Sequence, residues 1–350
     1  MMNTALPEPL DDKRVWLIID SLTFGGIETH VFELAKGLKV FDVNVTVVFV
    51  AHYGQPALLS EKLEQASIPF FYLNHAFPAR STFQSLTSAI VFHKPILIHA
   101  HGYKASIYSR LARFATPKVS FRHISTYHAG ETPKGRVKIY DFVDRYTSML
   151  SHACLSVSDL IKKKIPTPTF TLNNFIDTAD VSQSKGSEIA FVGRMSIEKA
   201  PDRFLDLSYQ NPQYHFHCYG SGPMETELKS RAPANLVFHG HQTNMDSIWQ
   251  NIELLVIPSR YEGLPMAALE AMARGIPILC TNVGDLNKLI EHDINGFITN
   301  DEAELNQYLA LWISKSESER ASMKVAAIHK VVDQYSTHSV LPQILAIYQI

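Results

Sequence analysis

The chain has 350 residues, which is more than one typical hydrophobic core needs and suits two domains of about 150 to 200 residues each. Hydrophobic residues make up 46% and charged residues 19% of the sequence, a globular composition that excludes a largely disordered protein. The three cysteines, Cys154, Cys218 and Cys280, form no CxxC pair, so we expect them to be reduced and buried.

Charge is distributed unevenly along the chain, although the net charge is only −2. Residues 1–165 contain 19 Lys and Arg against 13 Asp and Glu, whereas residues 166–350 contain 13 against 21. This asymmetry leaves two interpretations open, random scatter or contact of the basic half with an anionic membrane face. No Lys/Arg-rich run with interleaved aromatic residues occurs, so nucleic acid is not an expected partner.

The N-terminal stretch MMNTALPEPLDDKR is polar and acidic and lacks the apolar core of a signal peptide. The chain also has no apolar run of about 18 residues, the minimum for a membrane-spanning helix. Together these features predict a cytosolic protein, with peripheral contact at the inner membrane face as an open alternative.

The first half alternates short apolar runs with amphipathic helical stretches. Strands are predicted at 15–20, 43–51, 68–73, 95–101, 119–128 and 153–158, with helices between them. Such an alternation is typical of βαβ units, which build a parallel sheet.

The same rhythm restarts with the apolar run EIAFVGR at 188–194. Further strands are predicted at 214–220, 235–240, 253–259 and 276–282, and the chain after residue 302 is predicted to be helical. Between the two series lies a stretch rich in Pro, Thr, Ser and Asn, whose later part we interpret as an interdomain linker. The sequence therefore predicts two doubly wound α/β domains, 1–180 and 181–335, and a C-terminal helix, 336–350, that packs back on the first domain.

Ligands of doubly wound sheets bind beyond the carboxyl ends of the strands, so residues just after predicted strands are the candidates for a site. Gly25 and Gly26 precede a helix, whose N–H groups and dipole attract anions, although a simple turn explains them equally well. Arg194 and Lys199 share a short loop, and two cations in this position favour a diphosphate over a merely solvated loop. The glycine turn YGSGP (219–223) could lie against a nucleotide or be a plain turn.

The stretch YEGLPMAALEAMARG at 261–275 keeps two carboxylates beside an apolar helix. Glu262 is predicted in the loop before the helix and Glu270 inside it, and a buried charge is costly unless a polar group pairs with it. The hydroxyls of a ribose or a hexose are suitable partners. The backbone N–H groups of Gly263, Leu264 and Met266 at the helix start suit phosphate or sugar oxygens. With the nearby cations, these groups predict a pocket for a sugar linked through a diphosphate.

Three histidines lie at predicted strand ends of the first half. His99 and His101 alternate and share one face, but a metal site needs a third ligand, so polar histidines without a metal are the favoured interpretation. His128 could be an acid, a base or a polar positioning group, and an ordinary polar residue is favoured from this position alone. No DxD motif occurs, so the sequence offers no obvious metal–diphosphate clamp.

These motifs resemble the retaining, nucleotide-sugar-dependent GT-B glycosyltransferases of family 4, the group 1 glycosyltransferases. The resemblance rests on SLTFGGIETHVFELAKGL, HAHG, STYHAG, LNNFIDT, FVGRMSIEKAPDRFLDL and YGSGPMETEL, and most specifically on PSRYEGLPMAALEAMARGIPILCTNVGDLNKLI followed by NGFI. It extends over nearly the whole chain in the family's motif order. It implies two Rossmann-like domains facing a central cleft, an acceptor-binding one first and a nucleotide-sugar-binding one second.

The resemblance also implies roles for residues around the donor diphosphate. Gly25 and Gly26 are expected to lie against the phosphates and the acceptor, and Arg194 and Lys199 to neutralise the diphosphate. The backbone of Leu264, at the start of the apolar helix, is expected to contact the same group.

Around the donor sugar, the resemblance assigns contacts to His128, Glu262, Gly263 and Leu264, and it assigns the ribose hydroxyls to Glu270. The residues expected to carry the catalytic role are His128, Glu262, Arg194 and Lys199.

The implied reaction transfers a hexose from a nucleoside-diphosphate sugar, a UDP-sugar rather than a GDP-sugar, to a hydroxyl of a glycan or lipid-linked acceptor with retention. The usual setting of such enzymes is bacterial surface polysaccharide biosynthesis: lipopolysaccharide, capsule or exopolysaccharide. The family needs no metal, so no cofactor is expected beyond the nucleotide-sugar co-substrate. Two alternatives stay open, a catalytically silent nucleotide-sugar-binding subunit and a GT-B-type epimerase acting on UDP-GlcNAc.

Overall fold

The computed structural model describes residues 14–21, 25–54, 56–128, 135–179, 181–242 and 244–350. The chain forms two compact units, residues 1–175 with 340–350 and residues 176–339, and each contains one parallel sheet. The stretch 1–13, on which the prediction about a signal peptide rests, lies outside the described residues. In the ranges that are described, no helix is long and apolar enough to cross a membrane.

The first unit contains a seven-stranded sheet in the order β3-β2-β1-β4-β5-β6-β7. Its strands are β1 (Val15–Ile19), β2 (Val45–Phe49), β3 (Phe70–Tyr72), β4 (Leu97–His101), β5 (Arg122–Tyr127), β6 (Ala153–Ser156) and β7 (Thr169–Thr171). Its helices are α1 (Gly26–Val40), α2 (Leu58–Gln65), α3 (Leu73–Ala76), α4 (Thr82–His93), α5 (Tyr103–Ala115), α6 (Arg136–Tyr146), η1 (Ser148–Leu150), α7 (Asp159–Lys162) and most of α15 (Thr337–Tyr348). Because the chain adds strands first on one side of β1 and then on the other, the switch point lies between β1 and β4.

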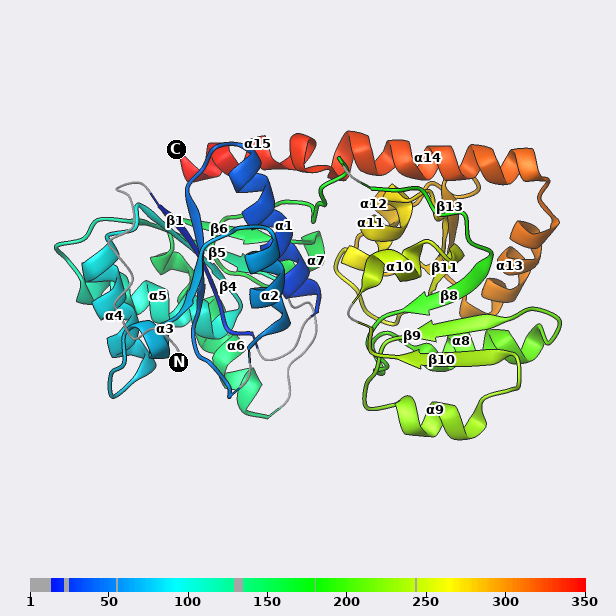
Figure 1. Ribbon diagram of the computed structural model, residues 1–350, viewed down its shortest axis with the longest axis horizontal. Helices are drawn as coiled ribbons and strands as arrows, with labels where there is room; N and C mark the ends of the chain where they lie inside the picture. The colour runs from blue at the N-terminus through cyan, green and yellow to red at the C-terminus, as the bar shows by residue number, and fades with distance from the viewer. Residues whose placement is uncertain (1–13, 22–24, 55, 129–134, 180, 243) are drawn as a thin grey trace. The chain divides into compact units, whose positions relative to one another are not determined.

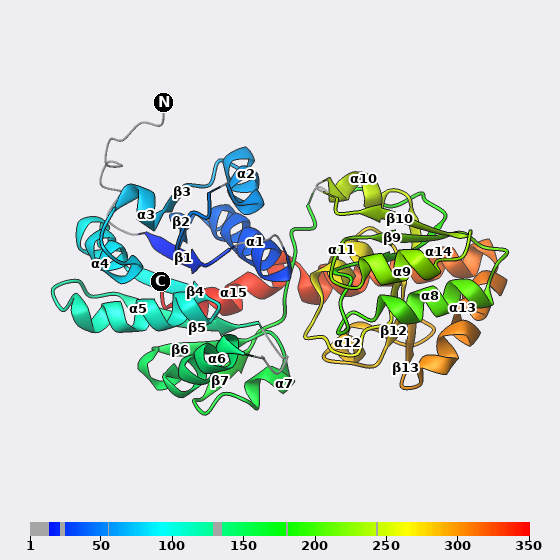
Figure 2. The ribbon, with the colours of Figure 1, turned by 90° about the horizontal axis from the view of Figure 1, so that it is seen from below.

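Side chains of β1 alternate between two apolar layers that cover the two faces of this sheet. Val15, Leu17 and Ile19 pack with α1, α2 and α15, whereas Trp16 and Ile18 pack with α3, α4 and α5. Figures 1 and 2 show α1 and α2 on one side of the strands and α4 and α5 on the other. Burial on both faces explains why the sequence of this strand is a continuous apolar run and not an alternating one.

The second unit contains a six-stranded sheet in the order β10-β9-β8-β11-β12-β13. Its strands are β8 (Glu188–Val192), β9 (Phe216–Tyr219), β10 (Leu236–Gly240), β11 (Ile252–Ile257), β12 (Ile278–Thr281) and β13 (Gly296–Thr299). Its helices are α8 (Pro201–Gln210), α9 (Glu225–Arg231), α10 (Met245–Trp249), α11 (Met266–Ala273), α12 (Leu286–Leu289), η2 (Glu302–Glu304), α13 (Leu305–Ser314) and α14 (Glu317–Tyr335). The switch point of this sheet lies between β8 and β11.

Alternation along β11 again separates two apolar layers. Leu255 and Ile257 pack with α10, α11, α12 and α14, and Leu254 and Val256 pack with α8, α9 and α13. In Figure 1, α14 of the first layer runs along the top of this unit and α9 of the second layer lies at its bottom. The predicted fold class, two doubly wound α/β units with a helical C-terminal end, is therefore confirmed.

Candidate functional site

A lysine and a buried carboxylate meet at the switch point of the second sheet. Lys199 lies in the loop after β8, and Glu262 lies in the loop after the neighbouring strand β11. The Lys199 ammonium donates to both carboxylate oxygens of Glu262 at 2.7 Å, and the Ser259 hydroxyl donates to one of them at 2.7 Å. The Glu262 side chain is 6% exposed and that of Lys199 33% exposed, so the cation is the more accessible partner. A charge this buried is tolerated because it is paired and hydrogen-bonded.

The two loops that carry this pair are fixed to one another. The Glu198 carbonyl accepts the backbone N–H groups of Arg260 at 2.8 Å and Tyr261 at 3.3 Å. The Arg260 guanidinium makes a bidentate ion pair with Asp202 at the start of α8, with N–O distances of 2.9 and 2.5 Å. This hydrogen bonding lowers the pKa of the Asp202 carboxyl. The positions of Lys199 and Glu262 are therefore set by the scaffold before any ligand binds.

The glycine turn YGSGP, for which the sequence left two interpretations, packs against the loop that carries Arg194. A Cβ on Gly220 would overlap the carbonyl of Gly193, and a Cβ on Gly222 would overlap the backbone of Met195. Gly220 also has a φ of +128°, which favours glycine. The close approach of two backbones explains both glycines without a nucleotide.

Gly284 packs against the loop that carries Glu262, which we call the acidic loop. Its φ is +61°, and a Cβ there would overlap the carbonyl oxygens of Glu262 and Gly263. The Asp285 N–H donates to the Gly263 carbonyl at 2.9 Å. The segment after β12 thus determines where the acidic loop lies.

Arg194 and the start of α11 complete the charged region of the second unit. The Arg194 side chain is exposed, and its guanidinium forms no hydrogen bond or ion pair with any other residue that the structure describes. Helix α11 begins at Met266 after Pro265. The Ala268 N–H donates to the Pro265 carbonyl at 3.1 Å, so the N–H groups of Met266 and Ala267 are the ones without an acceptor within the helix. The side chain of Leu264 is 3% exposed and packs in the core, so only its backbone could contact a ligand.

Glu270 lies half-buried on α11, and a tryptophan fixes its carboxylate. The indole Nε1–H of Trp249, at the end of α10, donates to Glu270 Oε2 at 3.0 Å. The Arg274 guanidinium donates to the Glu270 carbonyl at 2.9 Å one turn later. The orientation of the second predicted acid therefore depends on a residue 21 positions earlier in the chain.

In the first unit, Gly25 and Gly26 lie at the start of α1. Gly25 is extended, with φ −159°, and a Cβ on Gly26 would meet no described atom within 4 Å, so the backbone alone requires glycine at neither position. The Gly25 N–H already donates to the Glu28 carboxylate at 3.0 Å. Burial raises the pKa of the Glu28 carboxyl. An anion at this helix would therefore have to use the N–H groups of Gly26 and Ile27.

Four histidines cluster beside the switch point of the first sheet. His99 and His101 lie on β4, His30 on α1 and His128 directly after β5. The rings of His99 and His101 have centroids 4.2 Å apart, and those of His30 and His128 are 4.8 Å apart. Burial lowers the pKa of His30 to about 4 and holds the pKa values of His99, His101 and His128 well below their usual range. All four imidazoles are therefore neutral at pH 7.

One hydrogen bond in this cluster determines the tautomer of His128. His101 Nδ1 and His128 Nε2 are 3.0 Å apart, so one of them must carry the proton. His101 Nε2 is buried and has no hydrogen-bond partner among the described residues. Because a buried N–H without an acceptor is rarer than a buried unpaired lone pair, the proton of His101 is favoured on Nδ1. His128 then accepts at Nε2 and carries its own proton on Nδ1.

His30 lies close enough to His101 and His128 to be the third ligand that a metal site there would need. One nitrogen each of His30, His101 and His128 lies within 4.8 Å of the others, and neutral imidazoles are metal ligands. The sequence did not connect His30 with the other two. That no metal is required stays a prediction.

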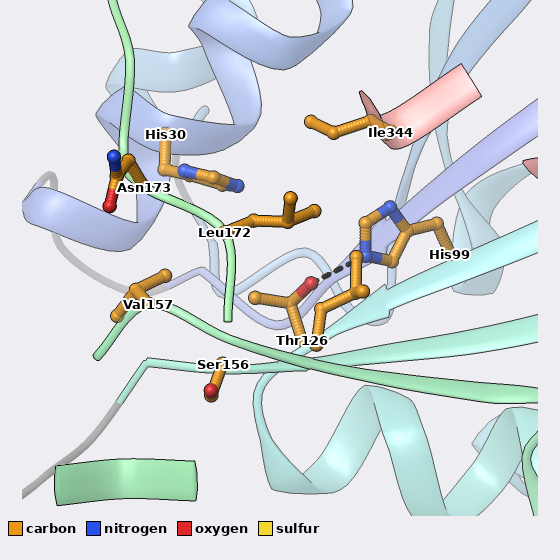
Figure 3. A pocket seen from close by; sticks show the side chains of 9 residues that line it. His30, His99, Thr126, Ser156, Val157, Leu172, Asn173 and Ile344 are labelled. Carbon is orange, nitrogen blue, oxygen red and sulfur yellow. Dashed lines mark hydrogen bonds between the residues drawn. The ribbon is translucent and has the colours of Figure 1, made fainter. Parts of the chain in front are cut away.

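A small cavity lies next to the histidine cluster and is also lined by Ile344 of α15, whose Tyr348 contacts His99 directly. Its lining includes His30, His99, Thr126, Leu172 and Ile344, and its volume is about 10 Å³. Figure 3 shows His30 and Ile344 on opposite sides of Leu172, with the hydrogen bond between His99 and Thr126 below them. This volume is at the lower limit for one water molecule, so the cavity holds no sugar.

The predicted residues are thus divided between the two units. Arg194, Lys199, Glu262, Gly263, Leu264 and Glu270 belong to the second unit, and Gly25, Gly26 and His128 belong to the first.

Four further contributors did not emerge from the sequence. Ser259 and Trp249 bind the two acids, Glu28 binds the Gly25 N–H, and His30 joins the histidine cluster. Of these, Glu28 could have been found, because its spacing from Gly25 is that of a capping box.

Comparisons with known proteins match both units. A family model described as "Glycosyl transferases group 1" matches residues 175–330, and one described as "Glycosyltransferase Family 4" matches residues 24–179. The O-antigen biosynthesis glycosyltransferase WbnH of Escherichia coli is 29% identical over 253 residues, 68% of this chain and 73% of that protein.

Solved structures share the fold at low sequence identity. Anabaena Alr3699/HepE in complex with UDP-glucose aligns with a TM-score of 0.82 at 17% identity, over 96% of this chain and 99% of that one. The lipopolysaccharide outer core galactosyltransferase WaaB aligns with a TM-score of 0.71 at 17% identity, over 97% and 99% of the two chains. The two family models together extend from residue 24 to residue 330. The chain therefore belongs to the group 1 glycosyltransferases of family 4, and its two doubly wound units are those of the GT-B fold.

Proposed function

We propose that the protein transfers a hexose from a UDP-sugar to a hydroxyl of a glycan or lipid-linked acceptor, with retention of the anomeric configuration. We place this reaction in the assembly of a bacterial surface polysaccharide of the O-antigen or lipopolysaccharide type. The observation that carries the proposal is the pair of Lys199 with Glu262, next to the exposed Arg194, at the β8–β11 switch point. WbnH, a relative of this chain, is described as an O-antigen biosynthesis glycosyltransferase, which supports the setting. The structure of Alr3699/HepE was solved with UDP-glucose, which supports the donor class.

The cations are suited to the diphosphate leaving group. Arg194 has no competing partner among the described residues, and the Lys199 side chain is 33% exposed although it pairs with Glu262. Together with the N–H groups at the start of α11, these cations would stabilise negative charge as it develops on the departing diphosphate. Because the loops are already fixed by the Arg260–Asp202 pair, little reorganisation accompanies binding.

The two acids are suited to hydroxyl groups. We assign Glu262 to the donor sugar and Glu270 to the ribose. A carboxylate has about four acceptor positions, so the bond from Trp249 to Oε2 is compatible with hydrogen bonds from ribose hydroxyls to the same group. Trp249 then acts as a positioning residue, because it holds one oxygen of the carboxylate in place.

Residues of the first unit keep the roles that we predicted for them. His128 with its proton on Nδ1 would present a hydrogen-bond donor to a sugar hydroxyl. The open space at Gly26 supports close approach of the phosphates to the start of α1. Glu28 limits that approach to the N–H groups beyond Gly25.

A thermal-shift measurement against UDP, GDP, ADP and their sugar conjugates tests the donor site. A ligand that binds only the folded state at about 100 times its Kd should raise the Tm of the second unit by about 5 °C. We expect this shift with UDP and UDP-sugars and its loss in Glu270→Ala and in Lys199→Ala. Lys229→Ala is the matched control, since Lys229 pairs with Glu225 on the exposed face of α9.

Turnover then separates the proposed enzyme from its alternatives. UDP release that depends on an acceptor, with the product anomer identified by NMR, would establish the transfer and its stereochemistry. A UDP shift without UDP release in any acceptor mixture would favour the silent subunit. Conversion of UDP-GlcNAc, without an acceptor, to a product whose sugar has an inverted configuration at a ring carbon would favour the epimerase.

We further propose that the transfer needs no metal ion. Treatment with EDTA should leave the rate unchanged, and metal analysis of the purified protein should find no stoichiometric ion. A rate that EDTA abolishes and Zn²⁺ restores would instead assign a metal to His30, His101 and His128.

A further inference from the structure

His99 differs from the other histidines of the cluster in how its ring nitrogens are used. Its Nδ1 lies 2.6 Å from the Tyr348 hydroxyl, and its Nε2 lies 2.6 Å from the Thr126 hydroxyl (Figure 3). In contrast, His30 Nδ1 and His101 Nε2 are buried and have no hydrogen-bond partner within the part of the chain that the structure describes. A buried polar atom without a partner needs an explanation, and a bound ion is one. His99 is therefore a structural residue, whereas His30 and His101 have nitrogens left to bind something else.

The three histidines other than His99 come from elements that meet at the switch point of the first sheet. His101 ends β4, His128 follows β5 directly, and His30 lies on α1. His101 pairs with Thr126 in the register of β4 and β5, so His128 is only two residues further along the neighbouring strand. The ring of His99 packs on that of His101, with centroids 4.2 Å apart. Side chains on or next to helices and strands are held more precisely than side chains on long loops.

The nitrogens of these three rings are close to the spacing of zinc ligands. One nitrogen each of His30, His101 and His128 lies within 4.8 Å of the other two. Nitrogens that surround Zn²⁺ tetrahedrally at the usual bond length are about 3.3 Å apart. His101 Nδ1 and His128 Nε2, at 3.0 Å, already fit this spacing. Only His30 has to come closer, by up to about 1.5 Å, which a change in its side-chain torsion angles can supply.

The type of ligand indicates which ion these nitrogens suit. Imidazole binds Zn²⁺, Ni²⁺ and copper, whereas Mg²⁺ and Ca²⁺ take oxygen ligands. Of the residues that the structure describes, no carboxylate belongs to this group of three histidines. His30 and His101 are 5% and 1% exposed, whereas His128 is only partly buried, so an ion would enter beside His128. Three protein ligands leave a fourth position for a water molecule.

We propose that His30, His101 and His128 bind one divalent transition-metal ion of the Zn²⁺ class, and that this ion is an inhibitor and not a cofactor. The ion replaces the hydrogen bond between His101 and His128, so both nitrogens offer it a lone pair and the proton of His101 moves to Nε2. Because that Nε2 is buried without an acceptor and His30 has to move, binding is weaker than at a structural zinc site.

The ion inhibits by taking His128 away from the sugar. A ring drawn toward the ion loses the orientation in which its Nδ1–H would donate to a sugar hydroxyl. This inhibition rests on the proposed function, whereas binding of the ion depends only on the geometry of the three histidines.

Visible absorption of Co²⁺ tests the metal site on protein that carries no affinity tag and has been freed of metal. Co²⁺ in a tetrahedral site has strong d–d bands, and we expect them to saturate at one ion per chain. Zn²⁺ should abolish the bands by displacement, whereas Mg²⁺ should not. His30→Gln and His128→Gln should each weaken Co²⁺ binding by about 100-fold or more, because each removes a direct ligand. His128 is partly exposed, so its substitution disturbs the fold less than that of the buried His30.

The matched control is His239→Gln on β10 of the second unit. His239 Nε2 lies 3.0 Å from His217 Nδ1, so this pair at the surface is another place where Co²⁺ could bind. His239→Gln should leave the bands unchanged, and urea unfolding verifies that each variant is folded. Absence of the bands, unchanged bands in folded His30→Gln or His128→Gln, or loss of the bands in His239→Gln would overturn the metal site.

Acceptor-dependent UDP release tests the inhibition. Saturating Zn²⁺ should lower the rate by about 10- to 100-fold, as expected for a displaced positioning group, and EDTA should restore it. The rate of His30→Gln should no longer respond to Zn²⁺. Zn²⁺ that binds at the three histidines without lowering the rate would contradict the inhibition. A protein that binds Co²⁺ but gives neither a UDP shift nor UDP release would contradict the proposed function and leave the metal site standing.

Discussion

The two units have the same doubly wound sheet but present opposite chemistry at their switch points. At β8–β11 the second unit presents charge, with Lys199 33% exposed and paired with Glu262. At β1–β4 the first unit presents neutral imidazoles, with His99 and His101 each 1% exposed. The difference follows from contact with water, because a half-exposed ion pair keeps its charges whereas burial removes the proton from a histidine.

Under the proposed function, this difference divides the work of the protein between the two units. An anionic diphosphate is best met by accessible cations and helix N–H groups, which the second unit supplies. Uncharged hydroxyl groups are best met by neutral donors and acceptors, and His128, the one histidine of the described cluster that is not fully buried, would supply such a group in the first unit. One scaffold thus supports two kinds of recognition through the loops that follow its strands.

The largest expected effect comes from removing the charge of Lys199. Lys199→Met should lower kcat/KM by about 100- to 1,000-fold, because it removes a cation from the departing diphosphate. It should also lower the free energy of unfolding by about 1–2 kcal/mol, because Glu262 loses its partner while the lysine was only partly buried. Urea unfolding and steady-state kinetics measure the two effects.

The double variant Lys199→Met with Glu262→Gln separates the two roles. It should recover stability, since no unpaired charge remains, without recovering activity. Recovery of activity in the double variant would show that the pair is merely structural and would remove the contrast between the units.

A pair of glycine substitutions sharpens the comparison. Gly284→Ala should destabilise the second unit by about 2–4 kcal/mol, because the residue has a positive φ and its Cβ would overlap the loop of Glu262. Gly26→Ala should leave stability unchanged or raise it by up to about 1 kcal/mol, because alanine favours a helix and meets no described atom. Urea unfolding curves compare the two.

The activity of Gly26→Ala then shows whether the donor phosphates lie against the start of α1. If phosphates lie against the start of α1, Gly26→Ala should lose activity at full stability. Full activity would show that the donor stays clear of this helix.

Acid should affect the first unit before the second. The unfolded chain protonates its histidines below about pH 6.5, whereas burial lowers the pKa of His30 to about 4 and those of His99, His101 and His123 well below the usual value. The unfolded state therefore binds more protons, and stability falls by about 1.4 kcal/mol per pH unit for each such histidine. This loss begins as the pH drops through 6.5 and continues until the folded-state pKa is reached.

Fluorine NMR of protein labelled with fluorotryptophan can follow both units at once. Trp16 reports on the first unit, and Trp249 and Trp312 report on the second. We expect the Trp16 signal to change first as the pH falls from 6.5 toward 4. Simultaneous loss of all three signals would mean that the buried histidines do not distinguish the units.

Periodicity predicted the strands from β1 to β6 and from β8 to β12, because buried parallel strands leave continuous apolar runs and amphipathic helices lie between them. It missed the edge strands β7 (Thr169–Thr171) and β13 (Gly296–Thr299), which are short. The position of Glu262 after a strand was also readable, because the loop is bounded by the strand IELLVI and the helix that begins at Met266. The hydrogen bond from Trp249 to Glu270 could not be predicted from the sequence. It joins two helices, α10 and α11, and hydrophobic periodicity does not show how two helices pack against one another. The same holds for His30, whose place in the cluster depends on how α1 packs on the sheet.

Glycines were the least reliable signal. Gly220 and Gly222 were considered for a nucleotide, yet a neighbouring backbone accounts for them. Gly25 and Gly26 looked like a turn, yet neither has a conformation that needs glycine. A glycine in a sequence does not show what lies next to it. Only the structure shows whether a neighbouring backbone occupies the place of its missing side chain, as at Gly220 and Gly222, or whether that place is open, as at Gly26.

The path of the chain through the first unit affects the order in which the protein can be completed. All seven strands of that sheet precede residue 175, but the core also needs residues 340–348 of α15. Ile344 lines the cavity beside His99, and the Tyr348 hydroxyl lies 2.6 Å from His99 Nδ1. During synthesis, the apolar face that α15 will cover must wait while the entire second unit is translated. The unit that begins first is therefore finished last, and its open face is what a chaperone would meet on the ribosome.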